Sequence, residues 1–358
     1  MNKCKRIGID IAKQIFQVHG VDKAGKTVLL KKLQRAEMLR FFAQQEPVLI
    51  GMEACGGSHY WARELGKLGH EVKLISPQFV KPYRKSSKND YNDAEAICEA
   101  VGRPNMRYVP VKNEEQQALL VMHRIRESWM DDRTSLMNQM RGHLHEFGIV
   151  MGQGRAALRK RLVEVLEDES LPLMFRQSMR SMQEALETLE EKLSALDKRI
   201  ESWSKQDEQA QRLMTLGGVG AITASAAVAT TGDARLFKNG RQYAAWLGLV
   251  PSQNSSGGKT KLGGITKRGD RYLRKLLIQG SRTVMLAAAR AQKRDAKDNP
   301  SALRYEWIHQ LQARRPNNVV AVAIAAKQAR ILWAMMAKGE SWNPYFDHNV
   351  KDLPVVVA

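Results

Sequence analysis

The sequence predicts an α/β domain at its N-terminal end, followed by a long helical segment and a mainly helical C-terminal domain. Three observations support this fold class. Short apolar runs alternate with helical periodicity up to about residue 110. Turn-forming residues then become rare between residues 114 and 205, where apolar residues recur at spacings of three and four. From residue 213 onward, glycine-rich turns are followed by long apolar stretches.

The first domain is expected to span residues 1–111, and its elements follow one another in an α/β order. In chain order they are a strand in RIGIDIA (residues 6–12), a strand pair in residues 16–33 that turns at Lys23 to Lys26, a strand in PVLIGME (47–53), a helix in 58–69 that ends at Gly69, and a strand in HEVKLIS (70–76). The sequence of strand, hairpin, strand, helix and strand is typical of an α/β domain.

Residues 112–206 are expected to form a helical linker or dimerisation segment. The apolar positions of its second half form a heptad seam, namely Met182, Leu186, Leu189, Leu193, Leu196 and Ile200. A looser seam runs from Met122 to Phe147, and three glycines and Pro172 mark a break between two helices. The pattern fits ordinary bundle core, an antiparallel hairpin or a coiled coil between subunits, and the sequence alone does not separate these.

The C-terminal domain is expected to span residues 207–340, with a tail over 341–358. Long helices are expected in residues 272–292 and 319–337. Between two apolar stretches, Gly218 and Gly220 form a turn that resembles a helix-hairpin-helix, in which backbone N–H groups bind a phosphate. A plain turn between helices is the alternative. A dinucleotide fingerprint is excluded because Thr223 stands where its third glycine would be.

The charge balance predicts a polyanionic partner. A formal net charge of +20 makes the chain repel itself unless phosphates lie nearby, so nucleic acid is favoured over an anionic membrane or a merely solvated surface. Three scattered cysteines indicate neither disulfides nor a zinc site. The longest apolar run, Val319 to Ala326, is too short for a bilayer span, and no targeting segment is visible, so a cytoplasmic protein without membrane contact is expected.

Four acids stand where packing gives no reason for them. Asp10 interrupts the first strand, Glu53 ends the strand PVLIGME, and Asp90 and Asp93 lie one helical turn apart at the start of a helix. Each has an ordinary explanation as a capping or surface residue. Together they would repel one another unless a cation neutralised them, and hard oxygen ligands suit Mg²⁺ or Mn²⁺. Such ions activate phosphodiesters in nucleases and strand-transfer enzymes.

A basic segment follows in the C-terminal domain. Its cations are expected to contact phosphates, and they are Lys259, Lys261, Lys267, Arg268, Arg271, Arg274, Lys275 and Arg282. The run GGKT is not a P-loop, because Gln253 occupies the position of the required glycine. Ser255 and Ser256 precede two glycines, and without a neighbouring base they are expected to form a turn or to bind phosphate.

The motifs GIDIAK, GMEACGG and KNDYNDAEA resemble the RuvC-like, ribonuclease-H-type domain of the DEDD transposases of insertion sequences, a group that includes Piv-type invertases and bridge-RNA-guided recombinases. The resemblance continues through most of the chain. It implies that Asp10, Glu53, Asp90 and Asp93 bind the metal. It also implies that Ser256, which precedes Gly257 in a P-x-x-x-x-S-G segment, forms a covalent link to DNA, with Ser255 as the alternative nucleophile.

The resemblance therefore implies a transposase or site-specific recombinase that cuts and rejoins DNA at element and target sites with a metal-assisted serine. The expected partners are DNA, a structured guide RNA and further copies of the chain, as a dimer or tetramer. The lack of a recognisable base-reading module fits guidance by RNA. Two other functions stay open: a hydrolytic RuvC-like nuclease such as a junction resolvase, and a non-catalytic nucleic-acid-binding protein.

Overall fold

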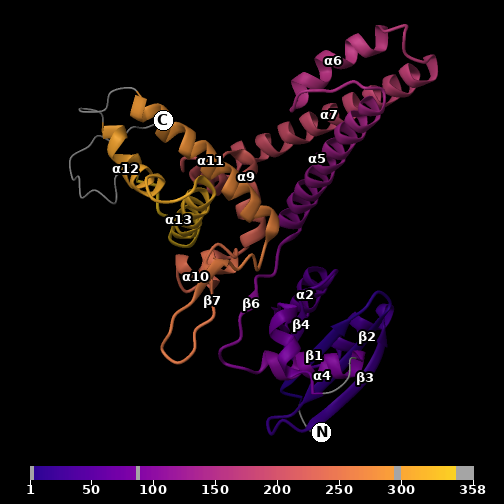
Figure 1. Ribbon diagram of the computed structural model, residues 1–358. Coiled ribbons are helices and arrows are strands. Elements are labelled where there is room, and N and C mark those ends of the chain that lie inside the picture. The colour runs from indigo at the N-terminus through magenta and orange to yellow at the C-terminus, as the bar shows by residue number, and fades with distance from the viewer. Residues whose placement is uncertain (1–3, 86–88, 294–299, 344–358) are drawn as a thin grey trace. The chain divides into compact units, whose positions relative to one another are not determined.

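The computed structural model describes residues 4–85, 89–293 and 300–343, and the chain forms two compact units (Figure 1). The first unit comprises Met1–Gln117 together with the short segment Thr231–Leu236. The second comprises Ala118–Thr230 and Phe237–Ala358. The first unit is thus discontinuous in sequence, which the sequence patterns do not indicate.

A six-stranded mixed sheet forms the centre of the first unit, with the strand order β3-β2-β1-β4-β5-β6. The strands are β1 (Arg6–Ile11), β2 (Ile15–Val21), β3 (Thr27–Gln34), β4 (Leu49–Glu53), β5 (Glu71–Ile75) and β6 (Tyr108–Val109). Strands β1, β2 and β3 pair antiparallel, whereas β4 and β5 run parallel to β1. The α/β N-terminal region is therefore confirmed, and the topology is consistent with the expected ribonuclease-H-type domain.

Helices cover this sheet, and two hydrophobic clusters fill the space between. The helices are α1 (Met38–Ala43), α2 (Ser58–Lys67), α3 (Pro77–Val80) and α4 (Asp90–Val101). Alternate residues of β1, such as Ile7 and Ile9, are fully buried in a cluster with Trp61 and Leu65 of α2. Helix α2 ends at Lys67, two residues before Gly69, and the φ of +89° at this glycine turns the chain after the C-cap Leu68.

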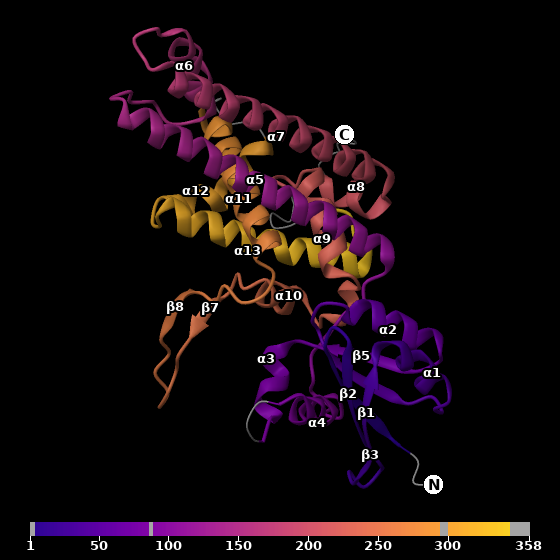
Figure 2. The ribbon, with the colours of Figure 1, turned by 90° about the vertical axis from the view of Figure 1, so that its right-hand side faces the viewer.

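A long helical hairpin opens the second unit. It consists of α5 (Glu114–Glu146), α6 (Arg155–Glu167) and α7 (Leu173–Gln206), and α5 and α7 lie side by side in both ribbon views (Figure 1 and Figure 2). Met140 of α5, Leu162 of α6 and Leu186 of α7 belong to one buried cluster. The two long helices match the apolar seams. Helix α6 lies in the expected break, between three glycines that precede it and Pro172 that follows it, where the sequence pattern did not indicate a helix.

The remaining helices and a small hairpin complete the second unit. They are α8 (Glu208–Met214), α9 (Ala221–Thr231), α10 (Gly240–Trp246), β7 (Pro251–Gln253), β8 (Leu262–Ile265), α11 (Arg271–Lys293), α12 (Pro300–Gln312) and α13 (Asn317–Lys338). Their largest cluster includes Leu213, Tyr243, Leu277 and Leu332. The mainly helical C-terminal region is thus confirmed.

Helix α13 is the one helix among the described residues that is long and apolar enough, by length and composition, to cross a bilayer. The longest uninterrupted apolar run, Val319 to Ala326, covers only part of this helix, because Lys327 and Arg330 follow it. Its side chains Val320, Ile324 and Leu332 are buried in hydrophobic clusters of the second unit. This burial is the ordinary behaviour of a core helix.

Candidate functional site: an acidic cluster and a basic serine hairpin

The ends of two parallel strands bring the first two acids together. Strands β1 and β4 pair in register up to Ile9 and Met52, and the next residue along each strand is Asp10 and Glu53. Both side chains are partly buried. The carboxyl ends of neighbouring parallel strands form the usual place for a site in an α/β sheet.

Two glycines let α4 bring the other acids onto this edge. Gly8 and Gly51 are register partners in β1 and β4, and α4 packs across both strands. A Cβ on Gly8 would lie 2.2 Å from the carbonyl oxygen of Ala94, and one on Gly51 would lie 2.7 Å from Cβ of Val101. Any larger residue would lift the helix, so the glycines set its close approach to the sheet.

The beginning of α4 gives its two acids different surroundings. Asn89 is the N-cap, because its side chain accepts a hydrogen bond from the Asn92 backbone N–H at 2.8 Å. Asp90 therefore does not act as the cap and lies exposed in the first turn. Asp93 is only 7% exposed. A capping role is thus excluded for Asp90, and a buried carboxylate at Asp93 needs a cationic partner.

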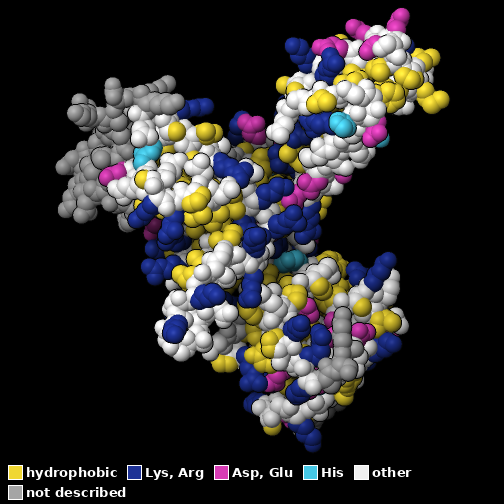
Figure 3. Space-filling view, viewed as in Figure 1, with side chains coloured by type: hydrophobic (Ala, Val, Ile, Leu, Met, Phe, Trp, Pro, Cys, Tyr) yellow, Lys and Arg dark blue, Asp and Glu magenta, His cyan; other side chains and the backbone are white. Residues whose placement is uncertain are grey.

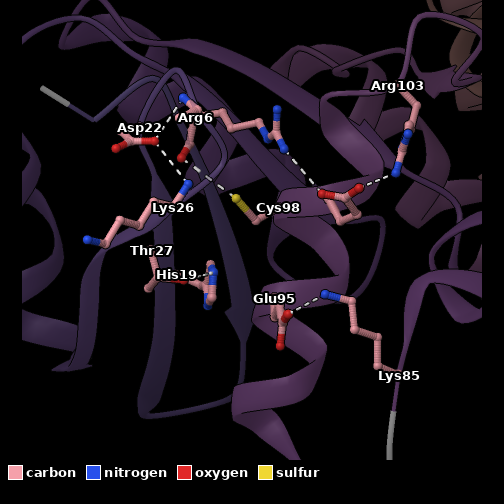
Figure 4. Close-up of polar contacts among 11 residues, drawn as sticks. Arg6, His19, Asp22, Lys26, Thr27, Lys85, Glu95, Cys98 and Arg103 are labelled. Atoms are coloured by element: carbon pink, nitrogen blue, oxygen red, sulfur yellow. Dashed lines mark hydrogen bonds and ion pairs between the residues drawn. The ribbon is translucent and has the colours of Figure 1, made fainter.

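Ion pairs anchor the remaining surface of α4 (Figure 4). Glu99 accepts from Arg6 of β1 at 3.2 Å and also pairs with Arg103, while Glu95 pairs with Lys85 at 2.8 Å. These acids have cations of their own within the first unit. Asp10, Glu53, Asp90 and Asp93 are distinguished from them by their mutual proximity.

Electrostatics shows that the four acids share one region. The pKa of Asp10 is raised to about 6, first by burial of the carboxyl group and then by the charges of Asp93, Asp90 and Glu53. The thiol of the neighbouring Cys55 also has a raised pKa, caused by burial and by the charges of Glu53 and Asp10. A group of like charges held together in this way favours a bound cation.

The structure also offers Asp93 a cation of its own. Oδ1 of Asp93 lies 2.6 Å from Nε of Arg84, although the two do not meet in hydrogen-bonding geometry. Within the described ranges, no three His, Cys, Asp or Glu side chains stand close enough to enclose a metal ion. Four neighbouring carboxylates, one of them with a buried unsatisfied oxygen, are nevertheless the kind of donor set that a hard divalent ion prefers.

The serine segment forms the tip of the β7–β8 hairpin. Ser256 and Lys259 form an antiparallel bridge, and the Lys259 N–H donates to the Ser256 carbonyl at 3.0 Å. Between them, Gly257 and Gly258 have φ values of +56° and +76°. Two positive φ angles in a two-residue loop are the requirement of a type I′ turn, which glycine meets without strain. The glycines therefore present Ser256 at the edge of a tight turn.

The two serines differ in their contacts. The Ser255 hydroxyl accepts a hydrogen bond from Nε2 of Gln253 at 2.9 Å. Both residues are exposed, and in the part of the chain that the structure describes the Ser256 hydroxyl has no hydrogen-bond partner. Among the described residues of this unit, no base is thus positioned on the Ser256 hydroxyl.

Seven of the eight basic residues predicted to contact phosphate are exposed on the second unit. Figure 3 shows Lys and Arg side chains distributed over the visible face of the second unit. Those exposed are Lys259, Lys261, Lys267, Arg268, Arg271, Lys275 and Arg282. Lys275 is already paired with Glu127 at 3.3 Å.

Arg274 differs from the other basic residues. It is 9% exposed, and its guanidinium donates to the carbonyl of Leu247 at 2.9 Å. The side chain thus holds the loop that follows α10, and it does not belong to the exposed cations of this unit.

The glycine turn between α8 and α9 has a packing role at one of its two positions. A Cβ on Gly218 would lie 2.6 Å from the carbonyl oxygen of Gly280 in α11, and the φ of Gly218 is +83°. A Cβ on Gly220 would meet nothing within 4 Å. The turn therefore packs on α11 through Gly218 and leaves Gly220, at the beginning of α9, open.

Two family models and several curated proteins match this chain. A model described as "Transposase IS116/IS110/IS902 family" matches residues 210–296, and a model of the DEDD transposases of IS110 matches residues 7–149. A probable family 20 transposase of Pseudomonas aeruginosa is 51% identical over 95% of this chain and 98% of its own length. The chain belongs to the IS110 family of DEDD transposases.

Two further transposases are similar over nearly the whole chain. The transposase for insertion sequence element IS1328 of Yersinia enterocolitica is 41% identical over 93% of this chain and 97% of its own length. That for IS1111A of Coxiella burnetii is 38% identical over 96% and 92%. Membership in this transposase family identifies an enzyme that cuts and rejoins DNA, as the resemblance had implied.

Two kinds of residue at the acidic cluster of this transposase were not predicted from its sequence. The glycines Gly8 and Gly51 lie inside strands, where glycine is unfavourable and marks a close backbone approach, so a signal for them existed. Arg84 gave no signal, because it is one of many cations outside any periodic pattern.

Proposed function

We propose that this transposase exchanges DNA strands at insertion-element and target sites through a covalent serine intermediate, assisted by divalent metal ions. The observation that carries the proposal is the gathering of Asp10, Glu53, Asp90 and Asp93 near the ends of β1 and β4, where burial and then the three neighbouring carboxylates raise the pKa of Asp10 to about 6. These carboxylates would hold Mg²⁺ or Mn²⁺. When bound, the ions supply positive charge that stabilises the phosphorane and the leaving oxygen.

Ser256 is proposed as the nucleophile. Its hydroxyl oxygen attacks the scissile phosphorus, the bond from phosphorus to one deoxyribose oxygen breaks, and that oxygen leaves with a proton. The serine proton passes to solvent. The new phosphoserine bond conserves the energy of the phosphodiester, so a deoxyribose hydroxyl of another strand can displace Ser256 without ATP. The exposed hydroxyl at the hairpin tip supports this role.

Cations around the hairpin would position the DNA backbone. Lys259 and Lys261 lie on the hairpin itself, and Lys267, Arg268 and Arg271 follow in the segment that leads into α11. All five are exposed. Gly220 would add the open backbone at the beginning of α9, with Gly218 fixing the turn. Such contacts set register on the DNA without reading its sequence.

A guide RNA and self-association complete the proposal. Base pairing with an RNA encoded by the element would supply the sequence information. The α5–α7 hairpin would act as a coiled-coil dimerisation segment. Sequencing of nucleic acid that copurifies with the protein tests the first point: a discrete RNA transcribed next to the gene supports it, and random cellular RNA contradicts it.

The serine step can be tested by covalent trapping. The protein is incubated with Mg²⁺ and a labelled nicked duplex that carries the element end, and denatured samples are examined for a protein–DNA adduct. Ser256→Ala should abolish the adduct. Ser255→Ala is the matched control, which should retain it because the neighbouring hydroxyl is engaged with Gln253. Retention of the adduct in Ser256→Ala would refute the assignment.

The same assay distinguishes recombination from simple hydrolysis of DNA, which is the reaction of the alternative function, a junction resolvase. A hydrolytic nuclease releases free ends, and Ser256→Ala would then still cut DNA. Asp10→Asn should abolish both cutting and adduct under either mechanism. A protein that only binds nucleic acid would tolerate that substitution.

A further inference from the structure

We propose that a cavity between α12 and α13 binds the nucleobase of an unpaired nucleotide. The cavity has a volume of about 640 Å³, within the usual range of ligand pockets of roughly 300–1,000 Å³. Its lining includes Tyr305 and Trp307 of α12, Lys327, Arg330 and Ile331 of α13, and Trp342 beyond α13. All of these residues belong to the second unit.

The aromatic walls are held by hydrophobic core. Tyr305 and Trp307 pack against a cluster that contains Ile308 and Val320. Trp342 packs against the large cluster of the second unit. Rings fixed in this way lose little conformational freedom when a ligand stacks on them. The cavity lining therefore includes three fixed aromatic residues, of the kind on which bases stack.

The charges at the cavity favour an anionic ligand. Nζ of Lys327 lies 5.1 Å from the centre of the Trp307 ring, and Arg330 is exposed on the same helix. The acid in the lining, Glu340, lies 3.3 Å from Nζ of Lys338, which offsets its charge. Aromatic rings beside cations are the combination that binds single strands, with the base stacked and the phosphate paired. An apolar peptide would not need the cations.

The ligand must be unpaired, because a base within a duplex is stacked on both sides and cannot enter a cavity. This inference rests on the proposed function, in which strands open and exchange partners and so expose unpaired bases. The chemistry is the same for a base of the DNA substrate and for one of a guide RNA. The experiment therefore uses both.

Photocrosslinking locates the base directly. The full-length protein is irradiated with short single-stranded DNA that carries 5-iododeoxyuridine, or with single-stranded RNA that carries 5-iodouridine, and crosslinked peptides are identified by mass spectrometry. We expect crosslinks to Tyr305, Trp307 or Trp342. A DNA-only result assigns the base to the substrate, and an RNA-only result assigns it to the guide.

Two outcomes overturn the inference. Crosslinks confined to residues 251–275 would show that the basic hairpin binds the strands while the cavity does not, and the proposed function would stand. Equal crosslinking of Trp307 by a fully paired duplex would contradict the requirement for an unpaired base.

Affinity measurements supply a second test. Trp307→Leu should weaken binding of the single-stranded oligonucleotide by about tenfold or more, since a stacked base contributes roughly one to two orders of magnitude. Trp307→Phe should preserve most of it. Trp333→Leu is the matched control, because Trp333 lies on α13 outside the cavity lining. Equal losses in the Trp307→Leu and Trp333→Leu variants would indicate general destabilisation and refute the assignment.

A variant that changes only charge covers the case in which Trp307→Leu fails to fold. Lys327→Gln should lower affinity and reduce the salt dependence of binding by about one phosphate contact. An unchanged affinity and salt dependence would refute the proposed phosphate contact at the cavity.

Discussion

Replacement of Asp10 by Asn should abolish strand exchange and, in metal-free buffer, make the protein more stable. Burial and three neighbouring carboxylates raise the pKa of Asp10 from 3.8 to about 6. Ionisation at neutral pH therefore opposes folding. Asparagine keeps the size of the side chain and removes its charge. If Asp10 serves catalysis, the substitution should therefore lower activity and raise the free energy of unfolding.

The pKa shift sets the size of the effect. A difference of about two units corresponds to about 3 kcal/mol as an upper limit. Because the Asp10 carboxylate is only partly buried, solvent screening lowers this to about 1–2 kcal/mol. Because the pKa of Asp10 is raised in the folded state, its ionisation lowers the free energy of unfolding. This loss of stability is complete above about pH 6 and disappears as the pH falls toward 3.8.

Urea unfolding of both proteins, with and without Mg²⁺, measures this difference. The gain in stability from Asp10→Asn should shrink at pH 4, and Mg²⁺ should stabilise the wild type more than the variant. Glu95→Gln is the control, because Lys85 lowers the pKa of Glu95 and its loss should be neutral or destabilising. If Asp10→Asn destabilised the protein at pH 7.5 without metal, the carboxylate would have a structural role and the reasoning would fail.

Three further predictions concern other parts of the molecule. The pKa of buried His123 is lowered to about 4 by burial, so stability should fall by up to about 3 kcal/mol as the pH drops from 6.5 to 4, and His123→Asn should flatten this slope in urea unfolding. Gly8→Ala should lower the free energy of unfolding by about 1–3 kcal/mol, because the new Cβ would lie 2.2 Å from the α4 backbone. Gly56→Ala is the control, and it should lower this free energy far less, because a Cβ there would meet nothing within 4 Å. Arg84→Gln should tighten Mn²⁺ binding several-fold in calorimetry by removing the cation that competes for Asp93, and a weaker affinity would show instead that Arg84 holds this ligand in place.

The N-terminal sheet could be predicted from the sequence because its signals are local. Alternation in β1 and the glycine that follows α2 depend on residues a few positions apart. The strand order, by contrast, depends on pairing between segments distant in sequence. Helix α6 was missed because the glycines before it and Pro172 after it indicated a loop, while its packing on α5 and α7 stabilises a helix that local propensity leaves undecided.

The candidate site was accessible to sequence reasoning for a related reason. Asp10 and Glu53 attract notice because a charge at a buried strand end has no packing role. The assignment of Ser256 came from the family resemblance, since a serine before two glycines fits any turn. The ion pair between Arg84 and Asp93 and the cavity near Trp307 arise only when separate helices and loops come together.

The β7–β8 hairpin would also determine when the proposed nucleophile, Ser256, can react. Every residue from Pro251 to Gly264 is exposed, and a lone two-stranded hairpin is only marginally stable in water. We therefore expect the free protein to hold Ser256 loosely, with the entropic cost of fixing it met only when bound DNA orders the hairpin. A brief encounter with unrelated DNA would end before the Ser256 hydroxyl is aligned. The low stability of this two-stranded sheet would therefore delay cleavage until the correct complex has formed.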